Sequence, residues 1–174
     1  GSWNGQVYSV GLWDAAIAIF ARKSVLEENG VRIPTLEQPW TLEEFDAALV
    51  TLKGAGFEYP IDMGLAWKGE WFPYAFSPLL QGFGGDMIDR STYSTAEGVL
   101  NGEQALAFGN WWQSLFTREL TPGTSQDGAD RETGFLEGKY AMQWNGNWAA
   151  LAALEKFGDD VLFLPAPDFG AGPK

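Results

Sequence analysis

The segment from residue 135 to residue 150 constrains the fold most strongly, because it predicts a helix end, a strand and a new helix in close succession. Gly138 tolerates the left-handed dihedrals that end many helices. Residues 140–144 then form a mostly apolar run of strand length, and an Asn-Gly pair interrupts it. The segment therefore predicts a buried strand that leads directly into a helix.

Trp148 begins that helix, and Asn147 before it is expected to act as the cap. The indole would then lie on a stiff element beside free backbone N–H groups. Such a surface suits a carbohydrate, because a sugar ring offers an apolar C–H face and a rim of hydroxyls. The alternative is an indole buried in the core, since a Trp after a strand is not a motif. The residues alone leave both interpretations of Trp148 open.

Strands and helices alternate along the rest of the chain. Strands are predicted at 7–10, 16–20, 61–66 and 161–164, and helices at 22–29, 42–53, 75–81, 102–116, 131–137 and 149–157. This order predicts a single α/β domain over residues 1–174, with a short sheet flanked by helices. Residues 165–174 are rich in Pro and Gly and are expected to form an exit linker or hinge segment.

Two helix starts have the spacing of a capping box. The Thr41 hydroxyl can accept a hydrogen bond from the amide of Glu44, whose carboxylate can reach back to the amide of Thr41. Asn101 and Gln104 have the same spacing and predict a second box. The apolar residues that follow each start recur at helical intervals, which supports both helices.

The charge and the missing residue types narrow the function. The chain has 23 acidic and 11 basic residues and a net charge of −12, which argues against nucleic acid or an anionic membrane as partner. It contains no histidine and no cysteine. Imidazole bases, thiol nucleophiles and the common zinc sites are therefore excluded, and we expect no metal and no cofactor. Any catalysis would depend on carboxylates, and a neutral ligand fits best.

Aromatic residues gather between Trp67 and Tyr74. This stretch holds four of them and one acid, Glu70, and that density exceeds what a turn over a core requires. The glycine-rich turn at 82–85 lacks both the spacing and the Lys-Ser/Thr pair of a phosphate loop. The aromatic stretch is therefore a second candidate for a ligand surface.

Four segments together resemble the sugar-binding class of extracellular solute-binding proteins of ABC importers, the class that includes maltose-binding protein. They are IFARKSVLEENGV at 19–31, PWTLEEFDAALVTLK at 39–53, LLQGFGGDMID at 79–89 and FLEGKYAMQWNGNWAAL at 135–151. The last is the most specific, because it matches the pattern Phe-x-x-Gly-Lys-x-Ala-Met-x-x-x-Gly-x-Trp. The chain departs from the family at 21–23, where Ala-Arg-Lys replaces Tyr-Asn-Lys, and at Asn147, where the family usually has Pro.

The resemblance implies one lobe of a periplasmic-binding-protein-like fold of type II. Family members are about twice as long and hold the sugar between two lobes joined by hinge strands. This chain resembles the second lobe, with one hinge crossing near residues 5–8 and another near 164–167. It would carry half of a binding site.

The resemblance also assigns roles to particular residues. Trp148 matches the aromatic that stacks on a sugar ring, and either Trp71 or Tyr74 matches a second stacking aromatic. Trp13 and Asp14 lie where the family often places a polar ligand contact. Two further candidates for hydroxyl contacts are Glu70 and Asn145. For Asp14, Glu70 and Asn145 a solvated loop position is an equal alternative, because exposed acids are common in so acidic a chain.

The function that this resemblance implies is a non-enzymatic carbohydrate receptor. Its partners would be a sugar or oligosaccharide, the missing first lobe and the membrane subunits of an ABC permease. The full-length protein would act outside the cytoplasm, either periplasmic or lipid-anchored at the cell surface. The alternative is a glycoside hydrolase or lyase using two of Asp14, Glu70 and Asp86, which would require a carboxylate pair about 5 to 9.5 Å apart. A weaker alternative is a lectin-like or protein-interaction module.

Overall fold

A four-stranded mixed sheet organises the chain in a computed structural model that describes residues 1–12, 15–67, 69–123 and 133–171. The strands are β3 (Ile17–Arg22), β4 (Ile61–Asp62), β5 (Met142–Gly146) and β6 (Val161–Leu164), in the spatial order β4-β5-β3-β6. β3 pairs antiparallel with β5 and with β6, whereas β4 pairs parallel with β5. The two central strands are therefore segments that lie far apart in the sequence.

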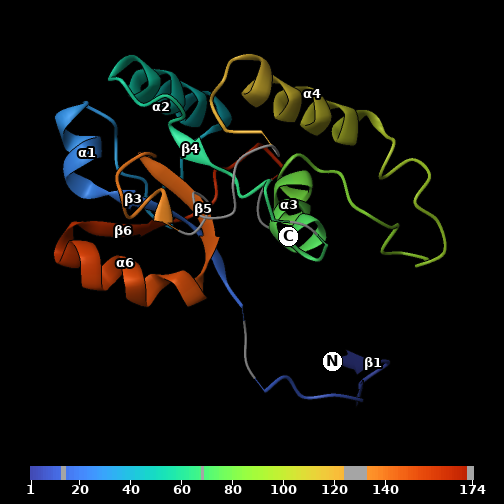
Figure 1. The fold of residues 1–174 in the computed structure, drawn as a ribbon. Helices are drawn as coiled ribbons and strands as arrows, with labels where there is room; N and C mark the ends of the chain where they lie inside the picture. The colour runs from blue at the N-terminus through green and yellow to red at the C-terminus, as the bar shows by residue number, and fades with distance from the viewer. Residues whose placement is uncertain (13–14, 68, 124–132, 172–174) are drawn as a thin grey trace.

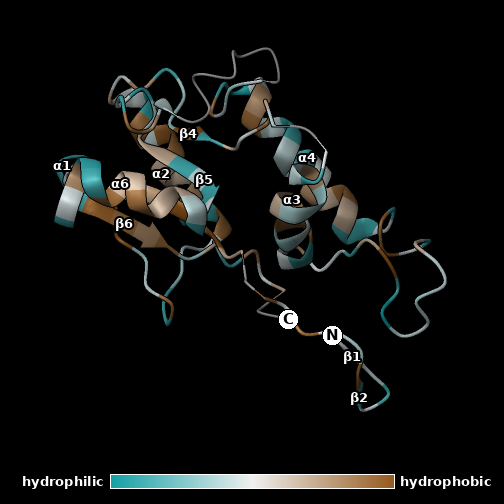
Figure 2. Ribbon diagram, turned by 60° about the horizontal axis from the view of Figure 1, so that its bottom comes forward, coloured by the Kyte–Doolittle hydropathy of each residue, from teal (hydrophilic) through white to brown (hydrophobic). Residues whose placement is uncertain are grey.

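Alternation along β3 divides the apolar residues between two cores. Ile19 and Ala21 face a large core that also takes in residues of α1 to α4, whereas Phe20 faces a smaller core with Phe135 and Ala153. Because successive side chains of a strand point to opposite faces, both faces of β3 are buried. β6 is hydrophobic throughout in Figure 2, and its end residues Val161 and Leu164 are buried whereas Phe163 is exposed.

The helices lie on both sides of this sheet. Figure 1 shows α6 on one side and α2 on the other. Their bounds are α1 (Lys23–Glu28), α2 (Leu42–Gly54), α3 (Trp71–Gly82), α4 (Glu103–Thr117) and α6 (Ala150–Phe157). Helices were predicted in each of these regions, and α3 begins four residues earlier than expected, so it includes part of the aromatic stretch.

The capping box at Thr41 is confirmed. The amide of Glu44 donates to the Thr41 hydroxyl at 3.2 Å, and the amide of Thr41 donates to the Glu44 carboxylate at 3.0 Å. Arg32 adds an ion pair to the same carboxylate at 2.6 Å, and this pair lowers the pKa of Glu44. The local sequence therefore fixes the start of α2 without help from distant segments.

The other predicted caps are wrong. Asn101 accepts a hydrogen bond from the amide of Gly98 at 2.7 Å, and the residue at the N-cap of α4 is Gly102. Asn147 is the first residue of a short 3₁₀ turn, η1 (Asn147–Ala149), and the N-cap is Gly146. The amide of Asn147 donates to the carbonyl of Ala16, which ties the start of this turn to the segment before β3.

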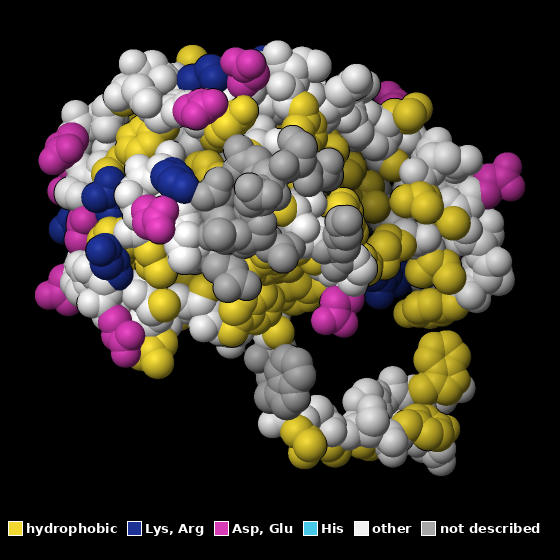
Figure 3. All heavy atoms as spheres, viewed as in Figure 1, with side chains coloured by type: hydrophobic (Ala, Val, Ile, Leu, Met, Phe, Trp, Pro, Cys, Tyr) yellow, Lys and Arg dark blue, Asp and Glu magenta, His cyan; other side chains and the backbone are white. Residues whose placement is uncertain are grey.

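Two predicted strands are shorter in the structure. β4 ends at Asp62, because Gly64 adopts a left-handed φ of 70° and a turn follows. Of residues 7–10 only Val7 lies in a strand, β2 (Gln6–Val7), which pairs with β1 (Ser2–Trp3) as a small hairpin. This hairpin extends away from the body in Figures 1 and 3, and Trp3 contacts the ring of Tyr93 at 5.7 Å between centroids. Two short strands without a hydrophobic face to bury do not extend further.

The helix predicted at 131–137 begins in residues outside the described part, and residues 134–138 form a turn. The predicted ends of the next helix are confirmed within one residue, since α6 stops at Phe157 and Gly158 follows with φ of 57°.

Residues 165–171 pack against the lobe near α2 and α3. The amide of Asp168 donates to the carbonyl of Trp40 at 2.7 Å. Phe169 stacks on Phe83 with 4.6 Å between ring centroids and contacts Trp111 at 5.0 Å. The described part of the segment thus has fixed contacts with the body of the domain.

Candidate functional site

Four aromatic side chains meet where the end of β5 lies beside the start of α3. We call them the aromatic cluster: Trp67, Trp71, Tyr74 and Trp148. The ring of Trp148 lies 5.8 Å from that of Tyr74 and 6.2 Å from each of the other two indoles, measured between centroids. The structure therefore brings together residues that the sequence separates by some eighty positions.

The cluster has an exposed layer over a buried one. Trp148 is 52% exposed, although it is a large indole among three other aromatic rings. Trp67 and Tyr74 are half-buried, and Trp71 is only 4% exposed. Trp71 also donates its indole N–H to the carbonyl of Met63 at 3.3 Å. Trp71 thus supports the cluster from below, and the rings able to offer area to a ligand are those of the other three residues.

The surrounding backbone fixes the exposed layer. The buried indole of Trp144 donates to the carbonyl of Ala75 at 2.9 Å, which holds β5 against α3. The Tyr74 hydroxyl donates to the carbonyl of Ala15 at 3.0 Å, and the amide of Asn147 donates to the next carbonyl, that of Ala16, at 2.9 Å. Three segments therefore converge on the cluster: the approach to β3, the start of α3 and the end of β5.

The other predicted site residues have different surroundings. Glu70 is exposed at the N-terminus of α3, directly before Trp71. Asn145 is 3% exposed, and its side-chain oxygen accepts the amide of Gly146 at 2.8 Å. Trp13 and Asp14 lie outside the described residues. Of the seven candidates, the structure thus gathers Trp148, Trp71 and Tyr74, with Glu70 adjacent in the chain.

Trp67 belongs to the cluster but was not among the predicted site residues. It contacts Trp71 edge to face at 4.3 Å. The density of aromatics between residues 67 and 74 was the available signal, because it exceeded the need of a turn. Sequence spacing could not select Trp67, since its place beside Trp148 depends on the turn at Gly64.

Of the three candidate carboxylates, only Glu70 and Asp86 lie in the described part of the chain, and these two are far apart. Asp86 accepts a hydrogen bond from the Gln81 side chain at 3.3 Å, whereas Glu70 precedes the first residue of the same helix. At a rise of 1.5 Å per residue, about 16 Å of helix separates Glu70 from Gln81, the residue that contacts Asp86. The Arg90 guanidinium, bonded to Asp86 at 2.9 Å, lowers the pKa of this carboxyl to about 2, so it stays ionised near neutral pH. A glycosidase acid needs the opposite shift.

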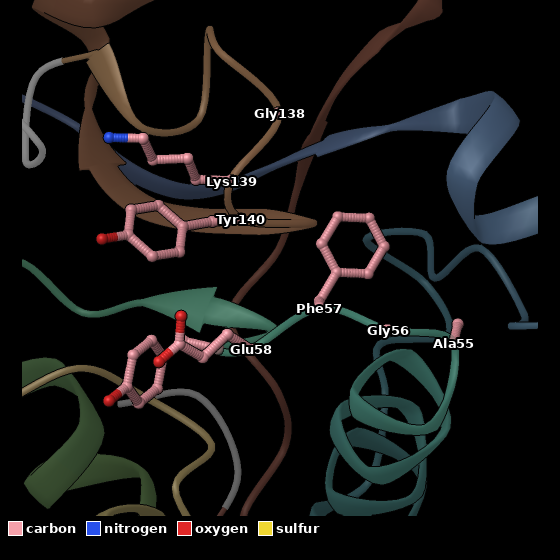
Figure 4. A pocket seen from close by; sticks show the side chains of 8 residues that line it. Ala55, Gly56, Phe57, Glu58, Gly138, Lys139 and Tyr140 are labelled. Atoms are coloured by element: carbon pink, nitrogen blue, oxygen red, sulfur yellow. The ribbon is translucent and has the colours of Figure 1, made fainter.

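Two hollows in the described surface lie away from the aromatic cluster. One, of about 540 Å³, lies between residues 55–59 and 138–140, and its Lys139 and Tyr140 side chains extend away from α2 (Figure 4). Another, of about 530 Å³, lies between the end of α3 and residues 165–169. Neither of these two hollows is lined by residues of the aromatic cluster.

Within the described ranges, His, Cys, Asp and Glu side chains form no group of three or more that could hold a metal ion. None of the helices in this part of the chain has the length and apolar character needed to cross a membrane.

Solved structures share this fold at low sequence identity. The GacH receptor of Streptomyces glaucescens aligns with a TM-score of 0.76 and 24% identity over 98% of this chain. A maltose-bound MalE3 of T. maritima aligns with a TM-score of 0.73 and 21% identity over 99% of the chain. An extracellular solute-binding protein of Staphylococcus aureus in complex with maltose aligns with a TM-score of 0.69 and 19% identity over 91%. The prediction of a periplasmic-binding-protein-like α/β lobe is confirmed by this likeness.

The alignments cover only part of those proteins. The chain spans 42% of the Streptomyces receptor, 44% of the T. maritima protein and 39% of the Staphylococcus protein. No curated protein matches the chain. A sequence model of a family described as bacterial extracellular solute-binding protein matches residues 1–173. Together with the fold, this match shows that the chain belongs to the bacterial extracellular solute-binding protein family.

Proposed function

We propose that this chain is the second, carbohydrate-binding lobe of a solute-binding protein that delivers a sugar or oligosaccharide to an ABC permease. The observation that carries the proposal is the half-exposed indole of Trp148 within the aromatic cluster. An exposed flat ring on a rigid support can cover the C–H face of a sugar. Relatives of the same fold are described as bound to maltose, acarbose and α-D-tagatose, which supports this ligand class.

We assign the stacking surface to Trp148 with Tyr74 and Trp67, and we assign Trp71 to its support. The reason is exposure, because a ring that is 4% exposed has no face left for a ligand. We propose that Glu70, which is exposed directly before Trp71, accepts hydroxyl hydrogen bonds at the edge of this surface. Asn145 is proposed to act mainly through the backbone, since its oxygen already accepts the amide of Gly146.

The open shape of the surface supports a site shared by two lobes. A sugar bound to this lobe alone would remain largely in contact with water, whereas binding sites usually bury most of their ligand. We propose that a first lobe, joined through residues 5–8 and 164–167, closes over the cluster by a hinge motion. Residues 1–174 would then form one lobe, with 165–174 leading toward the hinge. The protein would act outside the cytoplasm and would not be an enzyme, and we propose either a periplasmic or a lipid-anchored form.

A sugar screen on the two-lobe protein tests this function. Tryptophan fluorescence followed by calorimetry, with maltose, maltotriose, acarbose and tagatose as probes, is expected to show saturable binding of at least one. The same probes are then incubated with the protein and the products are separated by chromatography. Turnover that a Glu70→Gln change abolishes would contradict the receptor and favour the hydrolase.

A further inference from the structure

Gly146 lies directly beneath the Trp148 indole. A Cβ atom built on Gly146 would overlap Cζ3, Cη2 and Cε3 of that ring, far inside the 3.0 Å that real Cβ atoms keep. The six-membered part of the indole therefore rests on the backbone at the end of β5. Any side chain at this position would occupy the space of the ring.

The backbone of Gly146 gives no other reason for a glycine. Its φ of −86° and ψ of 164° are extended values that every residue adopts. Gly64, beneath the Trp71 ring, is different, because its φ of 70° favours glycine whatever lies above it. At Gly146 the three atoms nearest to an added Cβ all belong to the Trp148 indole, so the ring is the first group that a side chain would meet.

The strand end is held more firmly than the ring. The amide of Gly146 donates to the Asn145 side chain at 2.8 Å, and Gly146 is paired with Ile17 in the sheet. The next amide, that of Asn147, donates to Ala16 at 2.9 Å. Trp148, by contrast, is 52% exposed. A side chain at position 146 would therefore displace the indole and leave the strand in place.

We infer that Gly146 is a positioning residue for the sugar-stacking surface: its missing side chain lets the Trp148 indole lie flat on the strand end beside Tyr74 and Trp67. The ring is then oriented before any ligand arrives, which lowers the ordering cost of binding. The sugar-related part of this inference rests on the proposed function. The orientation of the ring does not, and it can be measured without ligand.

The ligand-free test compares Gly146→Ala with Gly109→Ala. Gly109 is exposed in α4, and a Cβ there meets nothing within 4 Å, so Gly109→Ala is the matched control. Indoles as close as those of Trp148 and Trp67 couple their transitions and give a circular-dichroism couplet. We expect Gly146→Ala to change this couplet and to raise acrylamide quenching, with the helical signal kept. An unchanged couplet and unchanged quenching would overturn the inference.

A double variant separates positioning from simple loss of stability. The three atoms nearest to a Cβ at position 146 are removed with the indole, so Gly146→Ala is expected to leave the melting temperature of a Trp148→Ala background unchanged. If Gly146→Ala lowers the melting temperature equally in both backgrounds, the clash is not with the ring and the inference fails. This comparison remains decisive even if the single variant folds poorly.

Maltose binding by the two-lobe protein tests whether Gly146 affects ligand binding. Gly146→Ala is expected to weaken binding about tenfold or more, and to have no further effect once Trp148 is Ala. A wild-type protein that binds no sugar would refute the proposed function and leave the spectroscopic result on the ring standing. A wild-type affinity retained by Gly146→Ala, despite an altered couplet, would overturn the role of Gly146 in binding.

Discussion

The indole nitrogen of Trp144 donates to the carbonyl oxygen of Ala75 at 2.9 Å, and both residues are buried. This hydrogen bond joins β5, which leads directly into the turn that holds Trp148, to α3, which holds Tyr74. The aromatic cluster is thus supported by a buried contact between segments that are far apart in the sequence.

Trp144→Phe removes that donor and leaves a small void. We expect a loss of about 1–3 kcal/mol in the free energy of unfolding, measured by urea denaturation. Trp3→Phe, at an indole that is 56% exposed, is the control and is expected to change stability by less than about 0.5 kcal/mol. Equal effects of the two changes would contradict a structural role for the Trp144 bond.

Trp148→Ala is expected to separate binding from stability. In the two-lobe protein it should remove about 1–3 kcal/mol of sugar binding, because the indole would be a central contact of the closed site. Its effect on the free energy of unfolding should be smaller than that of removing a fully buried indole, since half of the Trp148 side chain is already in water. Calorimetry and urea denaturation measure the two quantities.

Leu151→Ala, one turn along and 66% exposed, is the control that should alter neither. Unchanged affinity with reduced stability would return Trp148 to a core role.

The chain on its own is expected to fold and to bind sugar weakly or not measurably. Its cores are complete, whereas the aromatic cluster is open on one side. Calorimetry with the same sugar on this chain and on the two-lobe protein makes the comparison. Equal affinities would disprove the half-site.

Thr41→Ala tests the capping box of α2. The change deletes the acceptor for the Glu44 amide and is expected to cost about 1 kcal/mol of unfolding free energy. Thr41→Ser keeps the hydroxyl and should retain most of the stability. A Thr41→Ser variant as unstable as Thr41→Ala would show that the methyl group, not the cap, matters.

The ion pair between Asp86 and Arg90 predicts that the free energy of unfolding falls at acid pH. The pKa of Asp86 is about 2 in the folded chain, mainly because of the Arg90 hydrogen bond, against an ordinary value of 3.8, so the unfolded chain binds this proton more readily. The stabilisation is therefore complete above about pH 4 and is lost as the pH falls toward 2. Because Arg90 is 57% exposed, solvent screens the pair and we expect a loss of about 1 kcal/mol.

Asp86→Asn removes this dependence and measures its size. The variant should be less stable at pH 7 and should show a flatter stability profile between pH 4 and pH 2. Glu155→Gln, at an exposed position of α6, is the matched control. Parallel profiles for the wild type and Asp86→Asn would exclude the Arg90 pair as the source of acid sensitivity.

Local signals in the sequence determined the elements whose causes are themselves local. The capping box at Thr41 needs two residues three apart, and the apolar runs on either side of Gly146 predict a strand and a helix. The strand was predicted to break at Asn145, whereas β5 continues to Gly146 because both residues pair with β3. The same kind of reasoning was wrong for Asn101, whose side-chain oxygen accepts the amide of Gly98, and for Asn147, which lies inside the turn and not before it. A cap competes with every other hydrogen bond within reach, and the sequence does not show those competitors.

The residue types, their order and the family were thus determined by the sequence itself, including the exclusion of imidazole and thiol chemistry. Only the tertiary structure decided that Trp71 is buried while Trp148 is open, and that Trp67 joins them. The physical reason is that exposure depends on what packs above a ring. For these indoles the neighbours come from the turn at Gly64 and the end of β5, which meet only when the sheet pairs β4 with β5.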